Sequence, residues 1–210
     1  MVEWARYGRL GYCIEYCKVR CRVARLYKNK IQAKLVKAFR LRLGGYMVKI
    51  QIQLTDGRVM NASLDESAAP VTVDNFLKLI DKSFFNGLIF HRVIPGFMIQ
   101  GGGMDASLCP KDTKAIKGEF RANGVNNPLK HKVGTLSMAR TNVPDSASSQ
   151  FFICVEDCSF LDGQYAAFGE LTDEESIKVA VDISKVKTVS VGYYDDVPYD
   201  PIVIKQIVRA

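Results

Sequence analysis

The chain has 210 residues, of which 48% are hydrophobic and 24% charged, as in an ordinary globular protein. Its formal net charge of +7 comes from residues 1–46, which hold 12 of the 29 Lys and Arg and two of the 22 acids, so residues 47–210 are mildly acidic. This distribution argues against nucleic-acid binding by the body of the chain, and no apolar run approaches the roughly 18 residues that span a bilayer.

The basic segment 1–46 contains no Pro, Ser or Thr, and its residues 28–43 place large apolar side chains on one helical face among lysines and arginines. A basic amphipathic helix of this kind binds membrane surfaces or acidic partners. A loose basic tail, or a stretch upstream of the true start codon, is the simpler interpretation and the one that we favour. We take residues 47–210 as the folded domain and expect no stable membrane association.

Six cysteines are present, three of them spaced by four residues in the basic segment and three scattered in the body. The spacing is neither that of a zinc site nor the C-x-x-C of a redox pair. No leader with a charged start, an apolar core and a small-residue cleavage site is found. We therefore expect free thiols and a cytoplasmic location.

Period-two alternation predicts that the folded domain opens with two strands joined by a hairpin. Apolar residues occupy every second position in 47–54 (MVKIQIQL), Asp56-Gly57 is a turn signal, and the chain returns over 58–64. A helix is predicted over 70–83, with Thr72 as its N-cap.

The stretch 90–103 (FHRVIPGFMIQGGG) places one arginine, Arg92, among apolar residues and ends in three glycines. Strands are predicted over 88–94 and 96–100. A lone arginine in such a strand either keeps its head in water above its packed stem, or aims its guanidinium at a ligand on an apolar floor. His91 should point to the opposite face, as a packed residue rather than a general base. The glycines lack the G-K-[ST] of a phosphate loop and fit a close approach of backbones.

The second half of the domain alternates short strands with polar loops. Strands are predicted over 133–139, 150–155, 165–171 and 201–208, loops over 104–128 and 140–149, and a turn-rich link over 195–201. A capping box that begins at Thr172 predicts a second helix to about Val186. Because the helices are not interleaved between strands, we predict a mainly β fold, a closed eight-stranded antiparallel β-barrel capped by two α-helices.

Catalytic side chains are few. The chain has two histidines, His91 and His131, and has no nucleophile elbow or metal-ligand spacing. What remains is Arg92 with several glutamines and many apolar side chains. That set suits a site that binds an apolar group and works without proton transfer, metal or cofactor.

Three separated motifs resemble the signature set of the cyclophilin-type peptidyl-prolyl isomerases: FHRVIPGFMIQGG at 90–102, LSMAR at 136–140 and SQFFI at 149–153. Three motifs in the right order are far more specific than one. The resemblance runs from about Met47 to Val208 and is greatest to bacterial cytosolic members. It implies a barrel of eight strands capped by two helices, and acceleration of X–Pro isomerisation in protein folding.

The resemblance also implies the roles of individual residues. Arg92 matches the catalytic arginine, which would donate a hydrogen bond to the prolyl nitrogen in the twisted transition state. Phe160 stands where many eukaryotic members carry tryptophan, which implies weak cyclosporin binding, and Tyr165 stands where they carry histidine. The implied substrate-binding residues form the proline pocket, the groove and the rim: Phe97, Met98, Phe152 and Leu161; Gln100, Ala139, Arg140 and Gln150; Phe160 and Tyr165.

The implied partners are proline-containing peptides and unfolded or folding proteins, bound by a monomer without nucleic acid. An alternative is a chaperone or scaffold module that captures proline-containing loops, with incidental catalysis. Retention of Arg92 favours the isomerase, because a pure binder has no need of the donor. A further alternative, nucleic-acid binding through segment 1–46, predicts an affinity that falls steeply with salt and is lost from a chain starting at Met47.

Overall fold

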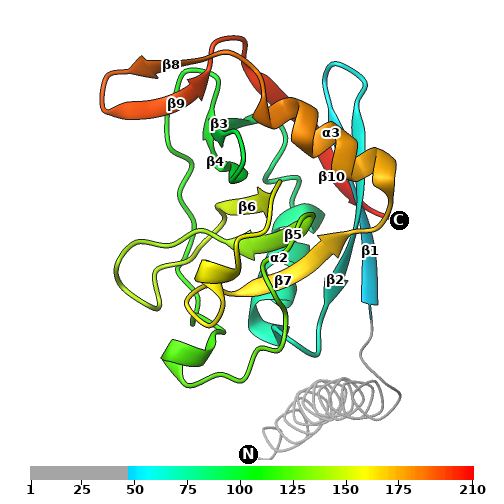
Figure 1. Ribbon diagram of the computed structural model, residues 1–210, viewed down its shortest axis with the longest axis vertical. Helices are drawn as coiled ribbons and strands as arrows, with labels where there is room; N and C mark the ends of the chain where they lie inside the picture. The colour runs from blue at the N-terminus through cyan, green and yellow to red at the C-terminus, as the bar shows by residue number, and fades with distance from the viewer. Residues whose placement is uncertain (1–46) are drawn as a thin grey trace, which may run out of the picture. The chain divides into compact units, whose positions relative to one another are not determined.

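The computed structural model describes residues 47–210, so the predictions for residues 1–46, including a helix over 28–43, lie outside the described part (Figure 1). Two short 3-10 helices, Arg121–Asn123 and Ser159–Leu161, lie in the loops. The strands and helices are β1 (Met47–Leu54), β2 (Val59–Asp65), α2 (Pro70–Asp81), β3 (Leu88–Ile94), β4 (Met98–Asp105), β5 (Thr135–Met138), β6 (Phe151–Cys154), β7 (Ala167–Leu171), α3 (Glu174–Ser184), β8 (Thr188–Val191), β9 (Tyr194–Pro198) and β10 (Ile202–Arg209).

Eight of these strands close into an antiparallel barrel in the order β1-β10-β3-β4-β6-β5-β7-β2, with two helices toward opposite ends (Figure 1). The predicted fold class is confirmed. The alternation in β1 places its apolar side chains on the inner face of the barrel, where Ile50, Ile52 and Leu54 are buried. Ile50 and Ile52 pair with Ala62 and Met60 of β2. Closure removes the exposed sheet edges that an open sheet would present.

The largest fully buried side chains of the barrel interior are phenylalanine rings. Phe76 of α2 lies 4.9 Å from Phe85, 5.3 Å from Phe151 and 5.1 Å from Phe168, measured between ring centroids. These pairs are tilted or edge-to-face, the arrangements that aromatic quadrupoles favour. Helix α2 is thus part of the core, and none of the helices in residues 47–210 is long and apolar enough to cross a bilayer.

Helix α2 is capped by a remote carboxylate and not, as predicted, by Thr72. The helix begins at Pro70, and Thr72 lies buried inside its first turn. Glu119, from the loop before β5, accepts hydrogen bonds from the backbone N–H groups of Val71 at 3.0 Å and Thr72 at 2.8 Å. A residue 47 or 48 positions away therefore satisfies the free donors of this helix, which no local pattern could show.

Helix α3 begins one residue later than the capping box predicted. Its N-cap is Asp173, whose side chain accepts the backbone N–H of Ser176 at 2.8 Å. Thr172 instead continues the sheet, because its N–H donates to the carbonyl of Asn61 at 3.0 Å. Thr and Asp are both favourable N-cap residues. Because Thr172 is bonded to Asn61 of β2, Asp173 becomes the N-cap of α3.

A two-stranded hairpin, β8–β9, stands apart from the barrel where a turn-rich link over 195–201 was predicted. Its strands are joined at Gly192, which has φ +59°. The alternation of Val189 and Val191 before that glycine was a hairpin signal that the prediction missed. Strand β9 lies alongside β3, and so the hairpin stands next to the strand that carries Arg92 (Figure 1).

Candidate active site

A second, smaller apolar cluster lies on the outer face of the sheet formed by β3, β4, β6 and β5. Strand alternation creates it: Phe151 of β6 packs in the barrel interior, and the next residue, Phe152, points outward. The buried members of this outer cluster are Met98, Phe152, Cys154, Cys158 and Leu161. This cluster lies outside the barrel and therefore takes no part in filling its interior. Three of its buried members, Met98, Phe152 and Leu161, instead line a surface cavity.

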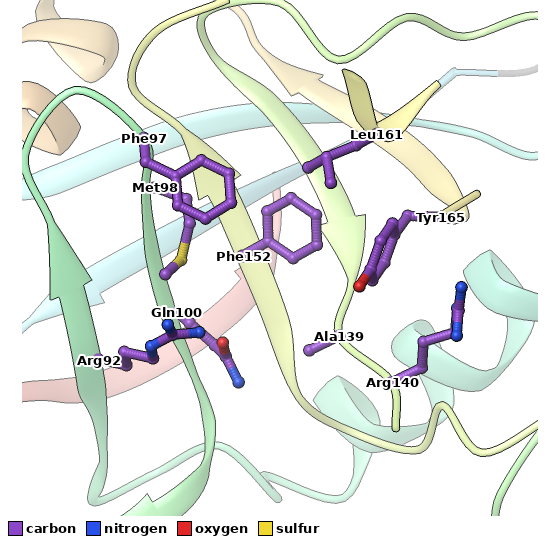
Figure 2. Close-up of a pocket in the computed structure, with 9 residues that line it drawn as sticks. All are labelled: Arg92, Phe97, Met98, Gln100, Ala139, Arg140, Phe152, Leu161 and Tyr165. Atoms are coloured by element: carbon purple, nitrogen blue, oxygen red, sulfur yellow. The ribbon is translucent and has the colours of Figure 1, made fainter. Parts of the chain in front are cut away.

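The cavity has a volume of about 220 Å³, below the range usual for drug-sized ligands and suited to a small group. Figure 2 shows Phe152 on its floor, with Arg92 and Gln100 on one side and Tyr165 and Arg140 on the other. The structure thus brings nine of the eleven predicted site residues together around one cavity: Arg92, Phe97, Met98, Gln100, Ala139, Arg140, Phe152, Leu161 and Tyr165.

A β-bulge aims Arg92 at the cavity. In the pairing of β3 with β4, Phe90 lies opposite Gly101 and Arg92 lies opposite Gln100, so that His91 is an extra residue on β3. Without the bulge, Phe90 and Arg92 would share one face by strict alternation. With it, Phe90 packs in the interior while Arg92 lines the outer cavity. Bulges commonly re-aim a side chain in this way beside active sites.

The Arg92 side chain is 47% exposed, and its Nε lies 3.6 Å from Oδ2 of Asp196 in β9. Its position combines the two predicted possibilities, since it lines the cavity with Phe152 and also reaches water. Sequence reasoning missed Asp196, because it placed this residue in a link rather than in a strand beside β3. The hairpin signal around Gly192 was the one feature that could have found it.

Two glutamines form the polar part of the wall. The Nε2 of Gln100 donates to the Oε1 of Gln150 at 2.9 Å. Gln150 does not line the cavity itself but lies against Gly103, where an added Cβ would stand 2.3 Å from the Gln150 side chain. The three glycines lie in strand β4 and allow close packing there, as predicted.

Phe152 is held between two rings. The His131 ring is stacked on it at 6.1 Å, and the Tyr165 ring meets it edge-on at 5.9 Å. His131 is fixed in turn by Asp162, whose Oδ1 lies 3.0 Å from Nδ1, and by Ser137, whose Oγ lies 2.9 Å from Nε2. This order resembles a hydrolytic triad, but Ser137 is fully buried and no substrate could reach it. The three residues brace the pocket floor.

Arg140 differs from Arg92 in that three of its five N–H donors are already used. Nε and Nη2 donate to the carbonyl of Gln164 at 3.1 and 3.0 Å, and Nη1 donates to that of Thr141 at 2.8 Å. Its guanidinium also lies 4.6 Å from the centre of the Tyr165 ring. A bond from Arg140 to a substrate backbone, as the family resemblance implies, would compete with these contacts.

Phe160, predicted at the rim, does not line the cavity but flanks it. Its side chain is 68% exposed, and its ring centroid lies 5.5 Å from that of Phe97. A large exposed aromatic beside an apolar cavity offers further surface to a ligand that extends beyond it.

His91 is a packed residue, as the sequence predicted. Burial lowers its pKa to about 4, so that the ring is neutral at physiological pH. Its Nδ1 has no hydrogen-bond partner among residues 47–210. It is not among the residues that line the cavity.

The described residues hold no group of three or more His, Cys, Asp or Glu that could bind a metal ion. The cysteines in this part of the chain are free thiols; Cys109 is exposed, and Cys154 and Cys158 are buried. Burial raises the pKa of Cys154, which keeps its thiol protonated and unreactive. The charged and amide groups that line the cavity are Arg92, Arg140 and Gln100, above an apolar floor.

Comparison with known proteins agrees with this geometry. A model of the family "Cyclophilin type peptidyl-prolyl cis-trans isomerase/CLD" matches residues 47–209. The chain belongs to the cyclophilin family. It is accordingly a peptidyl-prolyl cis-trans isomerase, with bacterial relatives. Peptidyl-prolyl cis-trans isomerase A of Dickeya dadantii is 48% identical over 149 residues, which cover 68% of this cyclophilin and 75% of the relative.

Further relatives extend the match. Peptidyl-prolyl cis-trans isomerase B of Escherichia coli is 42% identical over 159 residues, covering 72% of this cyclophilin and 93% of the relative. A crystal structure of a Cryptosporidium parvum cyclophilin is 28% identical with a TM-score of 0.65, covering 79% and 98% of the two chains. A second crystal structure of that protein, determined in the presence of the dipeptide Ala-Pro, has a TM-score of 0.63 at 28% identity and covers 77% and 98%.

Proposed function

We propose that the outer cavity binds the proline ring of an X–Pro segment, and that Arg92 accelerates isomerisation by donating a hydrogen bond to the prolyl nitrogen. The observation that carries this proposal is a partly exposed guanidinium on the wall of a small apolar cavity. The Ala-Pro dipeptide used with the related Cryptosporidium parvum cyclophilin supports a proline-containing ligand. No general acid or base is needed.

The reaction requires rotation about an amide bond. Resonance opposes that rotation with a barrier of about 18–20 kcal/mol. The two isomers of an X–Pro bond differ by only about 0.5–1 kcal/mol but interconvert over roughly 10–100 s. Acceleration by about 10⁴–10⁵ requires about 5.5–7 kcal/mol of transition-state stabilisation. The enzyme therefore needs groups that interact with the twisted amide more strongly than with the planar one.

A guanidinium meets this requirement. In the twisted amide the nitrogen becomes pyramidal and regains a lone pair, to which Arg92 can donate. The planar ground state offers it no comparable acceptor, so the gain is confined to the transition state. The apolar floor around Phe152 and Met98 would hold the ring still while the preceding carbonyl turns, with Gln100 placed to bind the substrate backbone. Arg140 would contribute the opposite wall by bracing Tyr165.

The substrates that fit are proline-containing peptides and proteins that are folding, because a proline pocket reads little beyond the ring and its predecessor. We expect the cyclophilin to act as a monomer in the cytoplasm, where buried free thiols such as Cys154 stay reduced. The exposed Phe160 in place of a larger indole predicts weak cyclosporin binding. Capture of proline-containing loops as a chaperone or scaffold module, with incidental catalysis, is the alternative function.

The test compares Arg92→Ala with Phe152→Ala in a proline-limited refolding assay and in peptide binding. Arg92→Ala should lower kcat/KM by about 10²–10³, the cost of removing one preorganised donor, with little change in peptide affinity. Phe152→Ala should weaken binding. If Arg92→Ala isomerises at the normal rate while Phe152→Ala abolishes binding, the arginine mechanism is wrong, although the cavity still binds the substrate. Circular dichroism of both variants verifies that each is folded.

A further inference from the structure

We propose that Asp196 is a positioning residue for Arg92: its carboxylate holds the Nε edge of the guanidinium, so that the terminal nitrogens face the cavity. The proposal rests on the proposed function, because it concerns the orientation of the same donor. Asp196 does not line the cavity, and it would act only through Arg92.

The contact is an ion pair rather than a hydrogen bond. Oδ2 of Asp196 lies 3.6 Å from Nε of Arg92, which is too long for a hydrogen bond and within the distance of an ion pair. The two side chains are 47% and 39% exposed, so water weakens the pair without abolishing it. Within residues 47–210, the guanidinium forms an ion pair with this carboxylate alone.

The backbone at Asp196 provides a second, independent observation. Its φ of +60° is the left-handed conformation, and only two other non-glycine residues in the described chain have a positive φ. In the hairpin, Val189 pairs with Val197 and Val191 with Tyr194, so that β9 carries one more residue than β8 in this interval. Asp196 thus lies in a bulge of β9 at a position where the backbone favours glycine. Asp and Asn are the non-glycine residues that adopt this conformation most readily, so the bulge holds a carboxylate in β9, beside β3, at little backbone cost.

The neighbouring acid shows that the pairing is specific. Oδ1 of Asp195 accepts a hydrogen bond from Oγ of Ser190 at 2.7 Å, within the hairpin itself. Two consecutive aspartates therefore have separate contacts, one inside the hairpin and one to the strand β3. Asp195 is a matched control, since its replacement removes the same charge one residue away.

The expected benefit is preorganisation. An unpaired arginine side chain has many rotamers, and most of them would not direct a donor at the prolyl nitrogen. A fixed carboxylate on the Nε edge selects rotamers in which the outer edge of the guanidinium, formed by Nη1 and Nη2, points away from it, so less freedom is lost in the transition state. Gln100, the polar neighbour on the same wall, uses its Nε2 to donate to Gln150.

The experiment measures kcat and KM of full-length Asp196→Asn and Asp195→Asn in a proline-peptide isomerisation assay. Asparagine tolerates a positive φ, so Asp196→Asn removes the charge and leaves the backbone conformation accessible. We expect a two- to fivefold loss in kcat, the scale of an exposed ion pair, with KM changed less than twofold. The loss should shrink at about 1 M salt, where exposed charges are screened. Asp195→Asn should match the native enzyme.

A double-mutant cycle separates the possible failures. In an Arg92→Ala background, Asp196→Asn should cause no further loss, because its partner is gone. If Asp196→Asn is as fast as the native enzyme while Arg92→Ala is slow, positioning is wrong and the proposed mechanism stands. If Arg92→Ala itself is not slow, the proposed mechanism fails first.

Two further outcomes would overturn the inference. A loss that depends on the charge of the residue before proline, tested with Ala-Pro, Lys-Pro and Glu-Pro peptides, would mean that Asp196 binds substrate directly. An equal loss in Asp195→Asn would mean a general effect of hairpin charge. Asp196→Gly, which the backbone accepts most readily, removes the carboxylate by a second route and should reproduce the loss seen in Asp196→Asn.

Discussion

The two faces of one strand, β6, divide stability from binding. Phe151 points into the barrel, is fully buried and meets the rings of Phe76, Phe85 and Phe90 at 5.3, 5.9 and 6.0 Å. Phe152, one residue on, meets protein rings on two sides and borders the cavity on another. Protein side chains fill the space around Phe151, whereas on the outer face an open cavity lies next to Phe152. Neighbouring residues of identical type can thus serve different ends because side chains alternate along a strand.

The largest expected effect comes from truncating each ring in turn. Phe151→Ala should lower the free energy of unfolding by about 4 kcal/mol, because it empties a closed, well-packed site. Phe152→Ala should cost about 2 kcal/mol, since the space left behind joins an open cavity that water can enter. Urea unfolding measures both values. Peptide affinity should fall in the Phe152 variant and be normal in folded Phe151→Ala; equal affinities would erase the distinction between the two faces.

Acid should weaken the interior through its buried histidine. Burial lowers the pKa of His91 from an ordinary 6.5 to about 4. Between those values the unfolded chain binds a proton that the folded chain does not, so stability is full above about pH 6.5 and falls as the pH approaches 4. The loss should be on the order of 3 kcal/mol. Burial also lowers the pKa of His131, which acts in the same direction.

Urea unfolding at pH 7.5, 6.0 and 4.5 measures this loss, and His91→Gln is the control that removes the group. The variant should show a smaller fall over the same range. A native protein whose stability is constant down to pH 4.5 would contradict the burial argument. Carboxylates such as Asp173, whose pKa is lowered by the backbone N–H of Ser176, contribute only at still lower pH and do not confuse the result.

The barrel was predictable because its signals are local. Strict alternation, as in β1, states which face is inside, and the turn signal at Asp56-Gly57 fixes the first hairpin. The caps were less predictable: Glu119 reaches α2 from 48 residues away, and strand pairing shifts the α3 cap from Thr172 to Asp173. Contacts made by distant residues leave no mark in a window of sequence, even where the element that they complete is correctly placed.

The candidate site shows the same division. The motifs around Arg92, Ala139 and Phe152 identified most of the cavity wall, because the family resemblance supplied what spacing could not. The bulge at His91 was not predicted, although it decides that Arg92 faces outward. Asp196 was missed because its strand, β9, joins β8 and packs beside β3 without belonging to the barrel. Both the register shift at His91 and the packing of β9 beside β3 arise only in the folded backbone, so a local sequence pattern could not predict them.

The smallest expected effect separates the two arginines of the cavity. The Arg140 guanidinium is already bonded to the carbonyls of Gln164 and Thr141 and lies over Tyr165, so its loss should loosen one wall without removing a donor from the reaction. Arg140→Lys keeps the charge but loses the planar fork and most of the ring contact, worth about 0.5–1 kcal/mol at an exposed site.

We therefore expect Arg140→Lys to raise KM about two- to threefold and to leave kcat unchanged, in the same peptide assay used for Arg92. Arg92→Lys should instead lower kcat, because a single ammonium on a flexible stem cannot keep one edge toward Asp196 while another donor faces the cavity. A loss of kcat in Arg140→Lys as large as that in Arg92→Lys would place the reacting donor on the other wall. The number of committed hydrogen bonds, rather than closeness to the cavity, then decides which of two arginines is free to act on a substrate.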